Sequence, residues 1–182
     1  DRLAVIRAYE GDRKNRRHKP GRALEHLGYR FDVLSDYGAF RDLQRHRMLT
    51  IQWQALSPRH GYVMADDVVA AGAAGDFEEA MATSAALYDA LEPQFPAQAS
   101  YAVSLAYRLR YSMELNARAA LHMLELRTSP AGHPSYRRIC QDMHRLIATQ
   151  AGHHIVAGLM RFVDHSDAGS GLERRRLIDR DA

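Results

Sequence analysis

The sequence predicts an α/β or α+β fold in a single domain, because helical patterns outnumber the strand patterns and separate them. Residues 107–115 alternate apolar and polar side chains, which is the period of a strand buried on one face. Residues 27–34 alternate in the same way. Between and after these stretches, apolar residues recur every three or four positions, which is typical of helices packed on one side.

The composition supports a globular domain and narrows the class of ligand. The chain has 182 residues, of which 46% are hydrophobic and 26% charged, and its formal net charge is +3. All of its cationic residues except Lys14 and Lys19 are arginine, which binds phosphate and carboxylate groups through two parallel hydrogen bonds. Anionic ligands such as nucleotides, or nucleic acid, are therefore the first expectation.

The sequence favours a cytoplasmic location. No apolar run approaches the roughly 20 residues that a membrane-spanning helix needs. Cys140 is the single cysteine, which excludes an internal disulfide and favours a reducing compartment. The chain begins at Asp1 without the regions of a signal peptide, and we expect it to be a fragment of a longer protein.

The N-terminal segment is expected to be one short element and a basic loop. Residues 3–9 suit a short helix or strand, and the glycine- and proline-containing residues 10–22 form a loop. The loop contains a basic run at 13–19, for which two interpretations remain. It is either a solvated surface or an arm that faces phosphate.

Two helices in the middle of the chain are each preceded by a capping residue. Ser35 caps a helix that ends near Arg47, and Asp76 caps a helix over 77–91. The segments between them are predicted as a short strand, a loop and a connector, at 48–53, 57–61 and 66–75 respectively.

The C-terminal half is predicted to contain two more helices. Asn116 ends the second alternating strand and caps a helix that continues to Arg127. A long helix follows over 135–163. The domain then spans residues 1–165, and a flexible basic tail occupies 166–182.

Several reactive side chains have ordinary structural explanations. The adjacent His153 and His154 diverge by about 100° on a helix, so we expect no metal site there. Cys140 lies on the apolar face of the last helix and is expected to be buried. Trp53, the single tryptophan, has two interpretations, which are core packing and an aromatic wall of a ligand site.

A cationic triplet, Arg45-His46-Arg47, falls at the predicted end of its helix. One interpretation is structural, because cations in the last turn complement the negative end of the helix dipole by roughly 0.3–1 kcal/mol each. The other is functional. The two guanidinium groups would hold an anionic ligand, and His46 would form a hydrogen bond with a polar ring.

A second group of polar residues, Asn116, Arg118, His122 and Arg127, follows the second strand. Capping explains Asn116 alone. It does not explain the other three, whose spacing is expected to place them along one side of an otherwise apolar helix.

These motifs resemble those of the flavin-dependent thymidylate synthases. That family carries an Arg-His-Arg triplet at a helix end and, further along, an Asn-x-Arg-x3-(His/Asn)-x4-Arg run entered from a strand. Here the two motifs are Arg45–Arg47 and Asn116–Arg127, and the pair Glu25-His26 precedes them as in the family. The resemblance covers about residues 15–163.

The resemblance implies an α/β fold with a mixed sheet flanked by helices, a homo-oligomer, and FAD bound between subunits. It implies reductive methylation of dUMP to dTMP, with methylenetetrahydrofolate as the carbon donor and NADPH as the reductant of the flavin. Cofactor contacts are then expected from six residues, Arg45, His46, Arg47, Asn116, Arg118 and His122. Substrate contacts are expected from Arg127, Ser57 and Arg59, of which Arg127 and Ser57 are the candidate catalytic residues.

The part of the site expected to bind dUMP, which we call the substrate half, departs from the family pattern in three places. Ala55 stands where the family has a serine, although Ser57–Arg59 offers a Ser-x-Arg sequence two residues later. Ser100 stands where the family has an arginine for dUMP, and the segment that begins at Gly132 lacks the family's carboxylate. A catalytically inactive domain that binds FAD or a nucleotide is therefore the alternative. We expect thymidylate synthase activity of this chain alone to be absent or very weak.

Nucleic-acid binding is a hypothesis from a different class. The arginine excess and the basic segments at 13–19 and 173–180 favour it. The 22 acidic residues and the lack of a recognition-helix or aromatic-basic strand pattern disfavour it.

Overall fold

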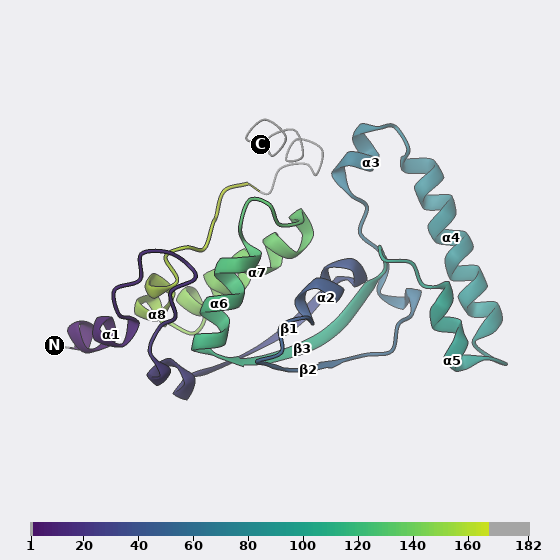
Figure 1. Cartoon of the computed structure of the whole chain (residues 1–182). Coiled ribbons are helices and arrows are strands. Elements are labelled where there is room, and N and C mark those ends of the chain that lie inside the picture. Colours follow the sequence, from purple (N-terminus) through teal and green to yellow (C-terminus); the bar gives the residue numbers. More distant parts are fainter. Residues whose placement is uncertain (1, 168–182) are drawn as a thin grey trace. The chain divides into compact units, whose positions relative to one another are not determined.

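A computed structural model describes residues 2–167 and places three strands in one sheet. The strands are β1 (Gly28–Asp36), β2 (Thr50–Trp53) and β3 (Arg108–Asn116), and β3 lies in the centre of the order β1-β3-β2 (Figure 1). Side chains of β3 are buried at every second position, as the alternation predicts. Both predicted alternating strands are confirmed, within one or two residues at each end.

Strands β1 and β3 are antiparallel. The Arg30 Nε lies 3.0 Å from the Glu114 carboxylate, and the Arg110 Nε lies 3.0 Å from the Asp32 carboxylate. Residue numbers therefore rise along β1 as they fall along β3. These four charged side chains line one face of the sheet, where Glu114 lies across from Arg30 and Arg110 reaches Asp32 diagonally.

The helices exceed the strands in number, and the predicted α/β (α+β) class is confirmed. The α-helices of the described residues are α1 (Arg2–Glu10), α2 (Tyr37–Leu43), α3 (Asp66–Ala70), α4 (Ala74–Leu91), α5 (Pro96–Ala99), α6 (Ala117–Arg127), α7 (Pro134–Thr149) and α8 (His154–Leu159). Three short 3-10 helices accompany them, η1 (Arg22–His26), η2 (Pro58–His60) and η3 (Ser100–Ala102). None of the helices within residues 2–167 combines the length and the apolar character needed to cross a bilayer.

The described residues form two compact units. The first unit contains residues 2–31, 46–51 and 113–167, and the second contains 32–45 and 52–112. The boundary of a single domain at residue 165 stays a prediction.

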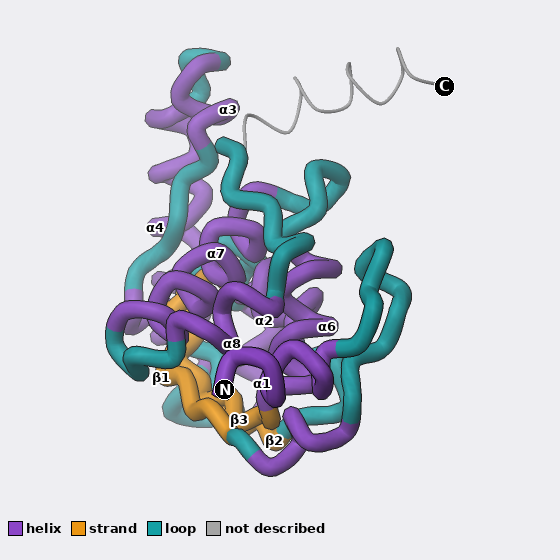
Figure 2. Tube along the Cα trace, turned by 90° about the vertical axis from the view of Figure 1, so that its left-hand side faces the viewer, coloured by secondary structure: helices purple, strands orange, loops and turns teal. Residues whose placement is uncertain are grey.

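Helix α6 forms the centre of the first unit. It packs against η1 and α7, while α8 packs against both α7 and α1 (Figures 1 and 2). Leu121 and Leu124 of α6 are buried together with Met143 and Ile147 of α7. Each such side chain contributes about 1.5–3 kcal/mol relative to an exposed position, so α6 is held firmly in place. Cys140 of α7 is buried as predicted, and burial raises the pKa of its thiol to about 12.

The second unit is organised around aromatic and helical contacts. Phe40 of α2 packs edge-on against Tyr111, with ring centroids 4.8 Å apart. The Tyr107 hydroxyl donates to the carbonyl of Met81 in α4. Helix α4 also packs against α3, α5 and η3.

The helix predicted to start at Ser35 and end near Arg47 is shorter than expected. Asp36 is the capping residue, because its Oδ1 accepts from the Ala39 amide at 2.7 Å. The Ser35 hydroxyl instead lies 3.0 Å from the Tyr111 hydroxyl inside the unit. Helix α2 ends at Leu43, so the cationic triplet follows the helix and is not part of its last turn.

Two other helix predictions need correction. The connector at 66–75 contains α3, whose first turn holds Asp66 and Asp67, which favour a helix N-terminus. Helix α4 begins at Ala74, so Asp76 lies in its first turn and does not cap it.

The long helix predicted over 135–163 is two helices. Helix α7 ends at Thr149, and α8 begins at His154. Gly152 between them has a φ of 69°, a left-handed conformation that terminates helices and that other residues rarely adopt. The predicted tail at 166–182 and its basic segment 173–180 lie outside the described residues, except for residues 166 and 167.

Candidate functional site

The candidate site is built on the junction between β3 and α6. The Asn116 side chain accepts from the Ala119 amide at 2.9 Å, which confirms the predicted cap. The Ala117 amide donates to the Leu27 carbonyl at 2.7 Å and so ties the start of α6 to the segment before β1. These two bonds fix the first turn of α6, and with it the direction of the side chains that follow.

His46 of the triplet lies against α6. Its Nε2 accepts a hydrogen bond from the Nε–H of Arg127 at 2.9 Å, across 81 residues of sequence. Its ring also meets the ring of His122 edge-on, with centroids 6.0 Å apart. The fold therefore brings the middle residue of the triplet into contact with two residues of the second motif.

His46 is neutral at physiological pH. Its side chain is half-buried, and burial together with the positive charge of Arg127 lowers the pKa of the imidazole to about 4. Proximity to His122 acts in the same direction. The site thus combines one neutral imidazole with permanent cations.

Arg127 is held on the other side by an aromatic ring. The centre of its guanidinium lies 5.3 Å from the centroid of Tyr136, a cation–π arrangement. The position of Tyr136 depends in turn on Gly132, where an added Cβ would come within 2.8 Å of the Tyr136 ring and 3.0 Å of the Arg127 carbonyl. Tyr136 was not predicted from the sequence, and no periodic pattern there would have indicated it.

Arg118 faces a different partner. Its Nη1 donates to the Glu25 carboxylate at 3.0 Å, and its Nε donates to the Pro20 carbonyl at 3.1 Å. Hydrogen bonds from Arg22, and the charges of Arg22 and Arg118, hold the pKa of the Glu25 carboxyl below its usual value. The contact joins the Glu25-His26 pair to the second motif.

The three residues Arg118, His122 and Arg127 do not form the single row expected on α6. Nine positions separate the two arginines, which is about two and a half turns, so their backbones lie on opposite sides of the helix. Arg127 contributes to the site through its long side chain and through His46.

The two arginines of the triplet are exposed. Arg47 lies in the first unit, and no ion pair or hydrogen bond to its side chain occurs within the described residues. Arg45 belongs to the second unit, where its Nε is 3.9 Å from the Asp42 carboxylate. The helix-end interpretation fails for Arg47, because α2 ends four residues earlier.

Ser57 and Arg59, expected to contact substrate, belong to the second unit. Ser57 precedes η2 without a side-chain capping bond. The Arg59 Nη2 lies 2.7 Å from both carboxylate oxygens of Glu92. Trp53 is also in this unit, and 56% of it is exposed, so the core-packing interpretation is wrong.

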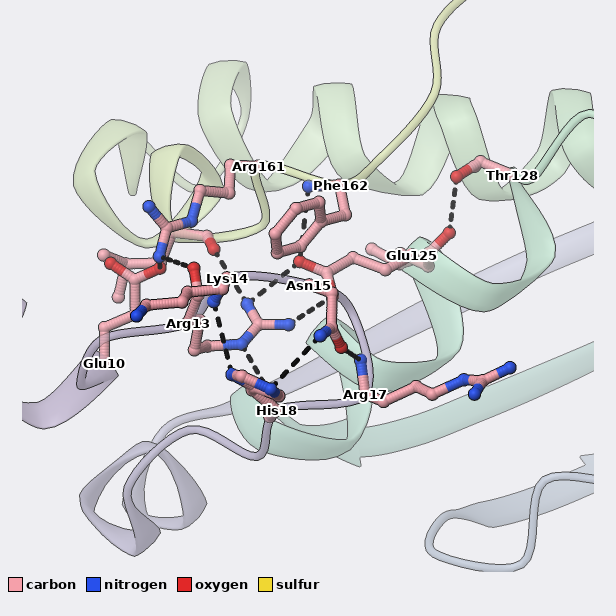
Figure 3. A network of polar contacts seen from close by, with 12 residues as sticks. Glu10, Arg13, Lys14, Asn15, Arg17, His18, Glu125, Thr128, Arg161 and Phe162 are labelled. Atoms are coloured by element: carbon pink, nitrogen blue, oxygen red, sulfur yellow. Dashed lines mark hydrogen bonds and ion pairs between the residues drawn. The ribbon is translucent and has the colours of Figure 1, made fainter.

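Arg13 at the start of the basic run is neither a solvated residue nor available to phosphate. Its guanidinium is buried and forms two hydrogen bonds to Glu125 of α6, at 3.0 and 2.5 Å (Figure 3). Its Nε and Nη1 also donate to the carbonyls of His18 and Leu159, and Phe162 covers the group. This network fixes the loop beside α6. In the sequence, Glu125 stands alone as an acidic residue among the apolar residues of α6, and this isolation could have indicated a buried ion pair.

No group of three or more metal-ligating side chains comes together within residues 2–167. The polar groups that contact His46 are imidazole and guanidinium groups, which suit an anionic or electron-rich organic ligand.

The fold matches that of solved flavin enzymes. One is thymidylate synthase X (ThyX) from Helicobacter pylori, solved with FAD and dUMP, with a TM-score of 0.65 and 18% identity. The match covers 87% of this chain and 83% of that one. A second ThyX structure from the same organism, complexed with FAD and dUMP, gives a TM-score of 0.63. The described residues thus have the fold of a flavin-dependent thymidylate synthase.

The sequence matches the family model described as thymidylate synthase complementing protein over residues 12–151. The chain belongs to this family, which confirms the resemblance seen in its motifs.

Curated relatives share a higher identity. A UPF0159 protein of Chlamydia muridarum is 36% identical over 171 residues, which is 94% of this chain and 32% of the relative. A UPF0159 protein of Thermoplasma acidophilum is 35% identical over 166 residues, which is 90% of this chain and 33% of the relative. The chain therefore spans about a third of the length of these relatives.

Proposed function

We propose that the first unit binds FAD, with His46, Arg47, Arg118 and His122 as its principal contacts. The observation that supports this proposal is the joining of three distant motifs in one unit. Glu25 contacts Arg118 across 93 residues, and His46 contacts Arg127 across 81. The proposal includes Arg45 and Asn116 as further cofactor contacts, by resemblance to the family.

The chemistry of these residues fits a flavin. The ring system gains electron density when it is reduced, and N–H donors and cations beside it stabilise that charge. Arg47 is exposed and Arg118 keeps its Nη2 without a hydrogen bond to the described residues, so both have donors for a ligand. Bound FAD would supply hydride for the reduction of a one-carbon unit.

The reaction that we propose is the reductive methylation of dUMP to dTMP. Methylenetetrahydrofolate would supply the carbon, and NADPH would reduce the flavin. Arg127 would orient the pyrimidine, and Ser57 and Arg59 would form the substrate loop. A homo-oligomer in the cytoplasm is part of this proposal, since the family binds FAD between subunits.

One observation favours a second candidate, an FAD- or nucleotide-binding domain without turnover. A nucleotide phosphate carries nearly two negative charges and needs several cationic or N–H donors. One nitrogen of Arg59, Nη2, already pairs with Glu92, and Ser100, in place of an arginine, donates to the Ala97 carbonyl. The substrate half therefore offers fewer cationic donors than the family pattern implies.

The first test is a titration of the chain with FAD, followed near 450 nm, together with measurement of the oligomeric state. Replacing Arg47 with alanine removes one charged hydrogen bond, so FAD affinity falls by about 1.5–3 kcal/mol. The matched control is Arg145→Ala, which removes an exposed arginine of α7. No FAD binding at about 100 μM, a thousandfold weaker than a typical tight site, contradicts the proposal.

The second test is tritium release from 5-labelled dUMP in the presence of FAD, NADPH and methylenetetrahydrofolate. Absent or very weak turnover with FAD bound supports the second candidate. Turnover near an ordinary enzyme rate of about 1–10 per second supports the full synthase reaction.

A further inference from the structure

His46 and Arg127 share a hydrogen bond whose direction is unambiguous. Every nitrogen of a guanidinium group is a donor, and arginine does not lose its proton in proteins. The Arg127 Nε therefore donates, and the His46 Nε2, at 2.9 Å, must accept. An accepting Nε2 carries no proton, so a neutral His46 holds its single proton on Nδ1.

The opposite nitrogen of His46 is open. No hydrogen bond to Nδ1 occurs within the described residues, and Nδ1 is not among the buried polar atoms that lack a partner there. The Nδ1–H is therefore accessible from outside the first unit. The edge-on contact with His122 limits rotation of the ring.

We propose that Arg127 is a positioning residue that holds His46 as the Nδ1–H tautomer, so that the site presents a neutral hydrogen-bond donor to its ligand. Tyr136 supports this role, because its ring holds the guanidinium of Arg127 at 5.3 Å. The proposal rests on the proposed function only for the identity of the ligand. The tautomer itself follows from the geometry of the chain.

The tautomer limits which edge of a ligand fits against His46. An Nδ1–H accepts nothing, so the facing ligand atom must be a hydrogen-bond acceptor. A carbonyl oxygen or an unprotonated ring nitrogen meets this requirement, and an N–H edge does not. Arg127 then acts on this ligand through His46, in addition to the contact with the pyrimidine that the family resemblance implies.

Long-range 1H–15N NMR of the full ligand-free chain at neutral pH reads the tautomer directly, with His46→Gln to assign the signal. The expected spectrum shows a protonated Nδ1 and an unprotonated Nε2. A protonated Nε2 in the unmodified chain overturns the proposal.

Variants test whether Arg127 causes the tautomer. Arg127→Met keeps the length of the side chain but removes the donor and the charge, so the His46 signal becomes a mixture of both tautomers. Tyr136→Leu shifts the signal in the same direction, whereas the control Tyr136→Phe keeps the ring and the original tautomer. An unchanged Nδ1–H signal in Arg127→Met contradicts the positioning role, and the Tyr136 pair decides it if that variant does not fold.

Ligand binding separates this proposal from the proposed function. If FAD binds, Arg127→Met weakens it about tenfold, the loss of one oriented hydrogen bond. If the unmodified chain shows the Nδ1–H tautomer but does not bind FAD, the proposed function fails and the positioning role stands. If FAD binds while Nε2 is protonated, the proposed function stands and the positioning role fails.

Discussion

Two groups of charged side chains meet at helix α6, one sealed and one open, which we call its sealed side and its open side. On the sealed side, Glu125 pairs with Arg13, and both side chains are only 1% exposed. On the open side, His122 is exposed, and Arg127 and His46 are half-buried. Arginine closes a buried ion pair in one place and holds the imidazole of the candidate site in the other.

The difference lies in how many hydrogen-bonding groups are already used. The donors of Arg13 reach Glu125 and the carbonyls of His18 and Leu159, which leaves the group closed to an additional ligand. On the open side, the Nδ1–H of His46 has no hydrogen bond to the described residues and is the donor that we propose for a ligand. Burial of a charge therefore does not by itself indicate a binding site, and unused donors are the better guide.

The largest expected effect is on the sealed side. Glu125→Leu leaves the Arg13 guanidinium buried without a counter-charge, so the free energy of unfolding falls by about 3–5 kcal/mol in denaturant titrations. The double variant Arg13→Met with Glu125→Leu serves as the control and is more stable than Glu125→Leu alone. A loss below about 1 kcal/mol, the value of an exposed pair, would show that the two sides of α6 do not differ.

A smaller effect is expected at the turn that supports Tyr136. In Gly132→Ala the new methyl group meets the Tyr136 ring and the Arg127 carbonyl, and such overpacking costs about 1–3 kcal/mol. Thermal unfolding measures the loss, and NMR shows whether the His46 signal changes with it.

The matched control is Gly158→Ala in α8, where an added Cβ meets nothing within 4 Å. That change is expected to stabilise the chain by about 0.5–1 kcal/mol, since glycine is a poor helix former. Equal effects at the two glycines would contradict the packing of Tyr136 against Gly132.

His46, on the open side of α6, is expected to make the free energy of unfolding depend on pH. Folding lowers the pKa of His46 from 6.5 to about 4, so the unfolded chain binds a proton that the folded chain does not. The contribution of His46 to the free energy of unfolding is fully present above pH 6.5 and is lost as the pH falls from 6.5 to about 4. One proton is taken up on unfolding at most, so His46 adds no more than about 1.4 kcal/mol per pH unit to the slope of the unfolding free energy against pH.

Urea titrations between pH 4 and 8 measure this slope. His46→Asn should lower the slope in that range without removing it, because burial also lowers the pKa of His165. The control His26→Asn, which changes an exposed histidine of η1, should leave the slope as it is. A profile that is the same with and without His46 would mean that the ring is as solvated in the folded chain as in the unfolded one.

The sequence predicted local features of the fold better than contacts between distant segments. Strand β3, the Asn116 cap and the end of α6 follow from alternation and capping within a few residues. The start of α2 was misplaced because Ser35 and Asp36 are both good caps. Only the burial of Ser35 beside Tyr111 decides between them.

The candidate site shows the same limit. Its motifs were recognisable by residue type and order, which identified His46 and Arg127 but not the bond between them. That bond depends on the register of α6 against a segment 81 residues earlier. Tyr136 and the pair of Arg13 with Glu125 were missed for the same reason, since no short-range pattern links them.

The smallest expected effect is at the exposed pair of Arg30 and Glu114, which lies in the same unit as both sides of α6. Their side chains are 74% and 52% exposed, so water screens the interaction, and Arg30→Ala should lower the unfolding free energy by no more than about 1 kcal/mol. Added salt weakens such a pair further but affects a buried pair far less. Denaturant titrations at low and high salt should therefore show the Arg30→Ala effect shrinking while the Glu125→Leu effect persists. If both effects shrink alike, water reaches Glu125, and the contrast between the sealed and open sides of α6 fails.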